Sequence, residues 1–246
     1  MMRRAGILLT VLVLSTSGSA ASQSHWSYLG RTGPSHWGSI EPDYATCGTG
    51  KEQSPINIET AKVRRQKLPP LAFDYHRFAL HIIDNGHTIQ VDVPTGSSLT
   101  VAGHRYALVQ FHFHRPSEET VNGRSSDMVA HLVHRDAKGQ LAVVAVLLDS
   151  GRPNPLLSAT WRNLPRDNGH EFKSSHVTVN PAQLLPSGRK YYTFRGSLTT
   201  PPCSEHVRWF VLKSPASIST EQLAIFGKHY PSNARPVQPL NGRVVL

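Results

Sequence analysis

Histidine and phenylalanine alternate in the stretch Gln110-Phe111-His112-Phe113-His114. Alternation of this kind is typical of a β-strand, because successive side chains leave opposite faces of a strand. His112 and His114 therefore share one face, roughly 6.6–6.8 Å apart along the strand, and the two phenylalanines share the other. The pattern predicts a strand with one apolar face and one imidazole face.

A second stretch, Ala130-His131-Leu132-Val133-His134, places His131 on a neighbouring strand, from which it can supply a third ligand. Zinc–nitrogen bonds are about 2.0–2.1 Å long, so imidazoles on one face can tilt onto a single ion. Three neutral nitrogen donors and one open position are typical of a catalytic zinc site. His134 leaves the opposite face and is not counted as a ligand. Because a histidine on an apolar strand is more often a hydrogen-bonded core residue, the histidines alone leave both interpretations open.

Composition indicates a folded chain without repeats. Hydrophobic residues make up 39% of the 246 residues and charged residues 17%, which is typical of a globular protein and not of a disordered one. No linker or low-complexity tract interrupts the sequence. We therefore expect one domain over residues 22–246, after an N-terminal segment of different character.

Residues 1–21 have the pattern of a secretory signal peptide. Arg3 and Arg4 precede an apolar stretch from Ala5 to Leu14, and small residues up to Ala21 offer a cleavage site. The apolar stretch is well short of the ~20 residues that a membrane span needs, and no other stretch is a candidate. An uncleaved anchor is the alternative. We expect a periplasmic or secreted protein with no transmembrane segment in the mature chain.

The cysteines indicate the redox compartment, and the net charge bears on the class of binding partner. Cys47 and Cys203 are the only cysteines, and an even count in an exported chain favours one disulfide over two free thiols or a cysteine ligand. The formal charge of +10 falls to +8 without Arg3 and Arg4. Lysines and arginines are scattered, and no basic run alternates with aromatic residues. The pattern predicts a solvated basic surface and no nucleic-acid partner.

Strands and loops dominate the predicted secondary structure. Asn85-Gly86 separates two short strand-like runs and indicates a tight turn. Residues 22–50 show no period and predict an irregular arm. Helices are expected over Pro155–Leu164 and Ser219–His229, the second capped by Ser219 or Thr220. Predicted strands, which we expect to form one continuous sheet, are Leu80–Ile83, Thr88–Val93, Tyr106–His114, Met128–His134, Leu141–Leu148 and Val207–Leu212.

Further strings accompany the histidines, and together they resemble the α-class carbonic anhydrases, particularly the exported bacterial members. The resemblance extends from about Trp26 to Leu246. Its strings are Trp26-Ser27-Tyr28, Gln53-Ser54-Pro55-Ile56-Asn57-Ile58, Asn85-Gly86-His87, Pro116-Ser117-Glu118, Gly196-Ser197-Leu198-Thr199-Thr200-Pro201-Pro202-Cys203 and Arg235-Pro236-Val237-Gln238-Pro239-Leu240.

The resemblance implies a mainly β fold, with short peripheral helices around a large, mostly antiparallel, twisted central sheet. It also implies Zn2+ on His112, His114 and His131, with CO2 and bicarbonate as substrates. Carbonic anhydrase is itself the standard example of zinc lowering the pKa of bound water to about 7, which provides hydroxide to attack CO2. A homodimer is a further possibility that the sequence leaves open.

Roles for other residues follow from the same resemblance. Thr199 is expected to accept a hydrogen bond from the hydroxide and to donate one to Glu118, because an ionised carboxylate only accepts. Thr200 is expected to contact bicarbonate. His87 is the expected proton shuttle, since its ordinary pKa of about 6.5 suits proton relay near neutrality. The residues expected to hold the intervening waters are Tyr28, Asn85 and Gln90.

CO2 is uncharged, so the resemblance implies an apolar pocket beside the metal. The positions that match the pocket of the family are Val133, Val143, Leu198, Val207 and Trp209. Gln110 shares the face of the metal ligands, where it can fix His112 through a hydrogen bond.

One position departs from the family pattern. The family usually has glutamate two residues before the third zinc histidine, where this chain has Val129, and many relatives have histidine where this chain has Glu119. Val129 cannot accept a hydrogen bond from His131, and losing such a partner commonly costs about 10–100-fold in metal affinity or activity. We hypothesise that Glu119, or a water molecule, replaces the missing carboxylate.

Two other functions compete with CO2 hydration. One is a zinc-free binding module on the same fold, which is disfavoured because all three histidines are present together with Thr199, Glu118 and His87. The other is a zinc hydrolase acting on esters, for which no sequence feature defines a binding cleft.

Overall fold

A computed structural model describes residues 26–165 and 169–246. The predicted signal peptide at residues 1–21 lies outside the described residues. Of the helices in the described part of the chain, none is long and apolar enough to cross a membrane.

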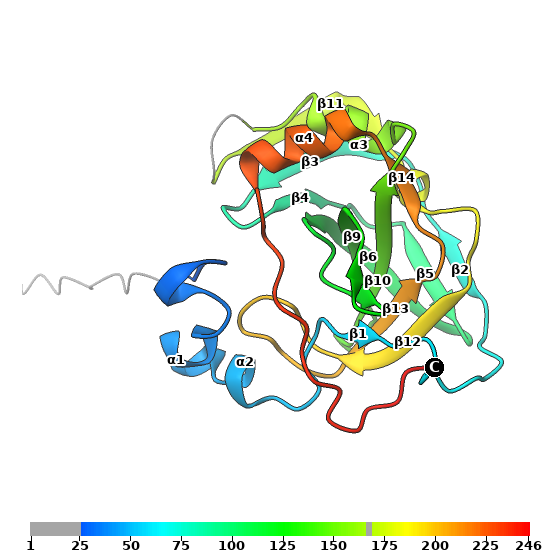
Figure 1. Cartoon of the computed structure of the whole chain (residues 1–246). Coiled ribbons are helices and arrows are strands. Elements are labelled where there is room, and N and C mark those ends of the chain that lie inside the picture. The colour runs from blue at the N-terminus through cyan, green and yellow to red at the C-terminus, as the bar shows by residue number, and fades with distance from the viewer. Residues whose placement is uncertain (1–25, 166–168) are drawn as a thin grey trace, which may run out of the picture.

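A large mixed sheet of eleven strands forms the body of the molecule (Figure 1). Its main path runs through β11 (Glu171–Val179), β3 (Phe78–Asp84), β4 (Ile89–Asp92), β6 (His104–His114), β9 (Met128–Arg135), β10 (Leu141–Ser150), β13 (Val207–Leu212) and β12 (Tyr191–Gly196). Three more strands attach to this path: β2 (Leu71–Asp74), β5 (Ser98–Val101) and β14 (Ala216–Ile218). All six strands predicted from the sequence belong to this sheet.

The pairing confirms a mostly antiparallel sheet, with two parallel exceptions, because β10 runs parallel to both β13 and β14. The expectation of one continuous sheet is wrong in one respect. A separate three-stranded sheet joins β1 (Asn57–Ile58), β7 (Thr120–Val121) and β8 (Arg124–Ser125). Each of these strands has two residues, which is too short for any alternation of apolar and polar side chains to indicate a strand.

Short helices surround the sheet, as expected. The longest is α4 (Thr220–His229), which Ser219 caps by accepting from the Gln222 amide in a complete capping box. The helix α3 (Pro155–Trp161) ends three residues before the predicted end, and Asn154 caps it. Figure 1 shows α3 and α4 together beside β11 and β3.

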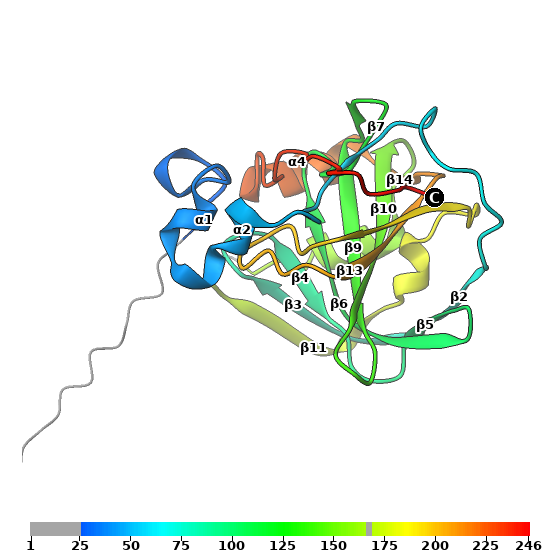
Figure 2. The same ribbon diagram turned by 90° about the horizontal axis from the view of Figure 1, so that it is seen from below.

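The segment predicted as an irregular arm is partly helical where it is described. It forms α1 (Trp37–Ile40) and α2 (Thr46–Thr49), together with the 3-10 turns Gly30–Thr32 and Pro42–Tyr44. Another 3-10 turn covers Pro181–Leu184. Helices of four residues are too short to show a helical period in the sequence. Figure 2 shows α1 and α2 lying together at one end of the sheet.

The two faces of the sheet bury different sets of side chains. Phe111 and Phe113 lie in the larger apolar cluster, which also contains residues of α3 and α4. Val129 and Val133 lie in a second cluster on the opposite face. Strand β10 contributes alternate residues to both clusters, so both of its faces are covered. The histidine face of β6 is therefore the face of the second cluster.

Candidate metal centre

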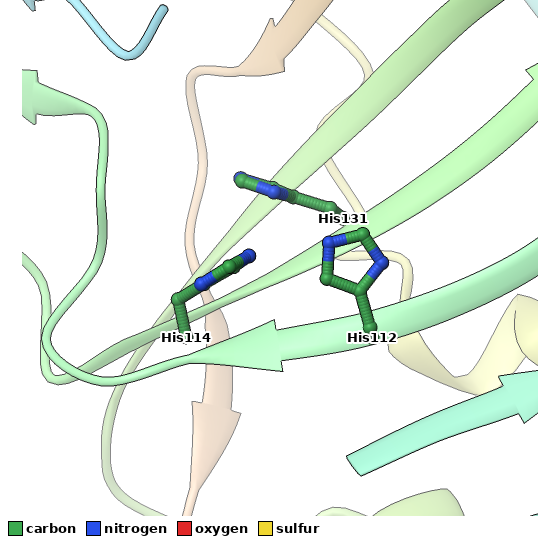
Figure 3. A group of neighbouring side chains, drawn as sticks. All are labelled: His112, His114 and His131. Atoms are coloured by element: carbon green, nitrogen blue, oxygen red, sulfur yellow. The ribbon is translucent and has the colours of Figure 1, made fainter. Parts of the chain in front are cut away.

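Three histidines meet on the face of β6 and β9 that carries the second apolar cluster. His112 and His131 are directly opposite each other in the β6–β9 register, and His114 is two residues further along β6. One ring nitrogen from each histidine lies within 4.8 Å of the others. The ring centroids are 5.0, 5.4 and 4.8 Å apart. Figure 3 shows the three rings directed toward a common space.

Each imidazole has a hydrogen-bond partner at one ring nitrogen. His112 Nδ1 lies 2.8 Å from Gln110 Oε1, His114 Nδ1 lies 2.8 Å from the carbonyl oxygen of Asn233, and His131 Nε2 lies 3.1 Å from Glu119 Oε2. His114 Nε2 is buried and has no hydrogen-bond partner.

A buried imidazole nitrogen without a partner is costly unless something else binds it. Three imidazoles, each held at one nitrogen and open at the other, are the donor set that zinc prefers. The residues present therefore fit a zinc ion, with Nε2 of His112 and His114 and Nδ1 of His131 as the donors.

The electrostatics of the three ligands differ. Burial and the charge of His131 lower the pKa of His112 to about 3, and burial lowers the pKa of His114 well below its ordinary value. These two imidazoles are therefore neutral at pH 7, as metal ligands must be. Burial acts to lower the pKa of His131, but the charges of Glu119 and Glu118 and the hydrogen bond that Glu119 accepts from the ring outweigh it, so the pKa is raised.

Glu118 lies buried between the ligands and the C-terminal segment. Its Oε1 accepts from the backbone amide of Arg235 at 2.8 Å, and its Oε2 lies 3.8 Å from His131 Nδ1. Burial raises the pKa of Glu118 to about 7, although the charge of His131 and the hydrogen bond from the Arg235 amide oppose this rise. A divalent cation on the histidines lowers the pKa of a neighbouring carboxyl. Glu118 Oε2 is buried and accepts no hydrogen bond, so the bond expected from Thr199 stays a prediction.

The loop that carries Thr199 is fixed by a disulfide. Cys47 in α2 is bonded to Cys203, as the cysteine count predicted. The Cys203 amide donates to the carbonyl of Thr200 at 2.8 Å, and the Leu198 amide donates to Ser204 at 3.0 Å. These bonds hold the loop of residues 198–204 beside the second apolar cluster.

The predicted pocket residues lie together in that cluster. Val133, Val143, Val207 and Trp209 are buried in it, and Leu198 packs against it. The ring of Trp209 meets the edge of His131 at a centroid distance of 4.9 Å. Apolar side chains thus border the metal ligands directly.

The turn that joins β3 to β4 carries His87. Asn85 Oδ1 accepts from the His87 and Thr88 amides at 3.0 and 2.9 Å, so Asn85 shapes the turn itself. Asn233 Nδ2 donates to the His87 carbonyl at 3.0 Å. The backbone of His87 is therefore held at both its amide and its carbonyl. Its ring stacks on Trp26, with centroids 3.6 Å apart and planes 10° apart.

Tyr28 and Gln90 were also expected along the proton path. The Tyr28 hydroxyl is buried without a hydrogen-bond partner, and its ring packs against Trp26. Gln90 is opposite His112 in the β4–β6 register and donates from Nε2 to Asp92 Oδ1 at 2.7 Å.

Two residues at the site were missed by the sequence analysis. The carbonyl of Asn233 holds His114 while its side chain holds the His87 turn, so one residue links a metal ligand to the turn. Arg235 is buried, and its guanidinium donates to Gln53, Ser54 and the carbonyl of Cys47. Arg235 begins one of the recognised strings, so it could have been found; no pattern in the sequence distinguishes Asn233.

Comparisons with known proteins agree with this geometry. The family model described as eukaryotic-type carbonic anhydrase matches residues 32–246. A carbonic anhydrase from Nostoc sp. is 42% identical over 234 residues, which cover 94% of this chain and 89% of that protein. A carbonic anhydrase from Klebsiella pneumoniae is 44% identical, with 96% of each chain covered.

A solved structure of a carbonic anhydrase is also similar to this chain. The α-carbonic anhydrase of Thermovibrio ammonificans, in complex with the inhibitor sulfanilamide, matches with a TM-score of 0.88 and 45% identity. The match covers 91% of this chain and 99% of that one. The chain therefore belongs to the α, or eukaryotic-type, carbonic anhydrases, the enzymes that interconvert CO2 and bicarbonate.

Proposed function

We propose that this enzyme hydrates CO2 with a zinc ion held by His112, His114 and His131. The observation that carries the proposal is the convergence of three ring nitrogens within 4.8 Å, each on an imidazole whose other nitrogen is hydrogen-bonded. Zinc bound there supplies a hydroxide nucleophile at neutral pH, an effect for which carbonic anhydrase is the standard example.

Thr199 and Glu118 orient the nucleophile. When Glu118 is ionised it can only accept, so the Thr199 hydroxyl donates to it and presents its own lone pairs toward the histidines. The backbone amide of Arg235 holds the carboxylate in place at 2.8 Å. A nucleophilic oxygen beside Thr199 then donates its hydrogen to that hydroxyl, which leaves a lone pair directed at CO2.

The apolar side chains beside the ligands receive CO2. CO2 has no charge and accepts hydrogen bonds weakly, so Val133, Val143, Leu198, Val207 and Trp209 bind it without a large desolvation cost. Thr200 follows Thr199 in the same loop and is half-buried, which suits contact with the polar product, bicarbonate.

His87 transfers the proton that each turnover releases. Its backbone is fixed by Asn85 and Asn233, so movement of the ring is confined to rotation about its side-chain bonds. The stack on Trp26 defines one position of the ring. Tyr28, Asn85 and Gln90 hold water between this ring and the metal centre in the proposed path.

Stopped-flow CO2 hydration, together with metal analysis of the purified protein, tests the proposal. We expect about one zinc per chain and activity that is lost with a chelator and restored by zinc. A zinc-free binding module would retain no metal and show no hydration. An ester hydrolase would turn over esters in preference to CO2.

The His87→Ala variant tests the proton path separately. We expect kcat to fall on the order of 10²-fold, the lower end of what a positioned acid–base group supplies, while kcat/KM stays unchanged. Imidazole buffer should restore kcat. A parallel fall in kcat/KM would contradict a role confined to proton transfer.

Export and dimerisation complete the proposal. The Cys47–Cys203 disulfide is typical of an oxidising compartment and supports a periplasmic or secreted enzyme. Cell fractionation with N-terminal sequencing tests cleavage after residue 21. A homodimer stays a prediction, which sedimentation of the zinc-loaded protein tests.

A further inference from the structure

A groove on the β12 edge of the large sheet is lined by cations, and no carboxylate of the described residues lines it. The cavity has a volume of about 490 Å³, and its charged lining consists of Arg189, Lys190 and Lys213. Leu68, Pro69 and Tyr191 contribute apolar surface to the same cavity. We call this cavity the basic groove.

Folding brings together three segments that contain no aspartate or glutamate. These are residues 60–73, 172–204 and 206–220. The Tyr191 hydroxyl donates to the Pro69 carbonyl at 2.7 Å, and the Lys213 amide donates to the Lys190 carbonyl at 2.8 Å. Figure 1 and Figure 2 both show the chain between β1 and β2 passing beside β12. Three cations from two of these segments, Arg189, Lys190 and Lys213, therefore line one cavity in the fold.

The charges in the basic groove repel one another. The pKa of Lys213 is lowered by burial and by the charge of Lys190. The charged ends of Lys213 and Arg189 lie over the rings of Tyr192 and Phe73, at 4.1 and 5.8 Å from the ring centroids. The segment that forms the opposite wall adds Arg64, Arg65 and Lys67 to the surrounding surface. A bound anion relieves this repulsion.

We propose that the basic groove binds a phosphate group that is attached to carbon. Arginine and lysine are the residues that recognise phosphate, arginine through its planar fork of donors. Leu68 and Pro69 give the attached carbon atoms an apolar surface. Among the residues that the structure describes, Tyr191 is the one aromatic residue lining the groove, and it is buried, so it offers no exposed face on which a nucleic-acid base could stack.

Two sources carry such a group, an anionic phospholipid headgroup and a soluble phosphate. The zinc-loaded protein is sedimented with vesicles of phosphatidylcholine containing phosphatidylglycerol, and with vesicles of phosphatidylcholine alone. In a second arm, its melting temperature is measured in glycerol 3-phosphate and in sodium chloride of equal ionic strength. Both arms use the wild type and two triple variants.

The groove variant is Arg189→Gln/Lys190→Gln/Lys213→Gln. The control variant, Arg124→Gln/Lys138→Gln/Lys228→Gln, removes the same charge from exposed positions elsewhere. Circular dichroism and CO2 hydration check that both variants fold, since neither changes a residue of the metal centre. We expect the groove variant to lose on the order of 10²-fold in binding to phosphatidylglycerol vesicles, and the control variant much less.

Each possible outcome either supports or overturns the proposal. Vesicle binding lost only in the groove variant supports it, with lipid as the source. Stabilisation by glycerol 3-phosphate without vesicle binding, again lost only in the groove variant, supports it with a soluble phosphate ester as the source. Equal losses in both variants, or no response to either probe, overturn it, because net charge alone then accounts for anion binding.

Discussion

Strand β9 carries one buried histidine on each face, and the two histidines have different surroundings. His131 and His134 are three residues apart and both are buried. His131 faces the metal centre, where Glu119 Oε2 lies 3.1 Å from its Nε2. His134 faces the larger apolar core, where its Nε2 lies 2.7 Å from the Tyr75 hydroxyl.

The pKa values of His131 and His134 shift in opposite directions because of their partners and not because of burial. Burial lowers the pKa of both imidazoles, and it lowers the pKa of His134 to about 4. At His131 the carboxylates of Glu119 and Glu118 outweigh burial and raise the pKa. The odd spacing along a strand separates the two side chains, so that His131 lies among carboxylates as a proposed metal ligand and His134 lies as a neutral residue in the core.

Replacing each histidine by alanine gives the largest expected contrast. His131→Ala removes a proposed ligand, so we expect zinc content to fall from about one per chain to near zero and CO2 hydration to be lost. His134→Ala should keep its zinc and its activity while losing about 3 kcal/mol of stability from truncation in the core. Metal analysis and stopped-flow hydration measure both. Zinc retention by His131→Ala would contradict the assignment of the three ligands.

Removing the negative charge beside His131 should have the next largest effect. Glu119→Gln keeps an oxygen that accepts from Nε2 but removes the carboxylate, so we expect zinc to dissociate about 10–100-fold faster. Val129→Glu in the same background restores a carboxylate at the position where the family usually has one. Dissociation is followed with a chromogenic chelator. If Glu119→Gln dissociates at the wild-type rate, Glu119 does not compensate for Val129.

Acid should destabilise the fold in part through His134. With its pKa lowered to about 4 in the fold and near 6.5 unfolded, His134 binds a proton more readily in the unfolded chain. The free energy of unfolding should therefore fall as pH drops from about 6.5 to 4, by up to about 3 kcal/mol from this group. His134→Gln should lose this contribution to the slope. Urea unfolding across that pH range compares the two proteins, and equal slopes would contradict the lowered pKa.

The sequence predicted which side chains share a face of β6 and of β9, because this depends only on the alternation of neighbouring residues along a strand. Alternation placed the phenylalanines in one core and the histidines on the other face, and the same rule separated His134 from the metal ligands. Two departures from the family pattern, Val129 in place of glutamate and Glu119 in place of histidine, also suggested a contact between Glu119 and His131. In the structure Glu119 Oε2 lies 3.1 Å from His131 Nε2.

Partners distant in the sequence could not be predicted in this way. Asn233 reaches His114 across 119 residues, and no periodic pattern relates the two positions. The edge strand β11 is mostly exposed, and an irregular register between Lys173 and Thr178 interrupts its alternation of exposed and half-buried side chains. The basic groove depends on which acid-free segments the fold brings together, and composition alone described its cations as scattered.

The smallest expected effect concerns the hydroxyl that partners His134. Tyr75→Phe leaves the imidazole nitrogen buried without a hydrogen bond, so we expect the free energy of unfolding at pH 7 to fall by about 1–3 kcal/mol. Zinc dissociation should stay at the wild-type rate, because Tyr75 lies in the larger apolar core and not on the face of the metal ligands. Urea unfolding and chelator kinetics on one preparation measure both. Faster zinc loss in Tyr75→Phe would mean that the two faces of β9 are coupled, and that the partners on one face help to set the metal affinity of the other.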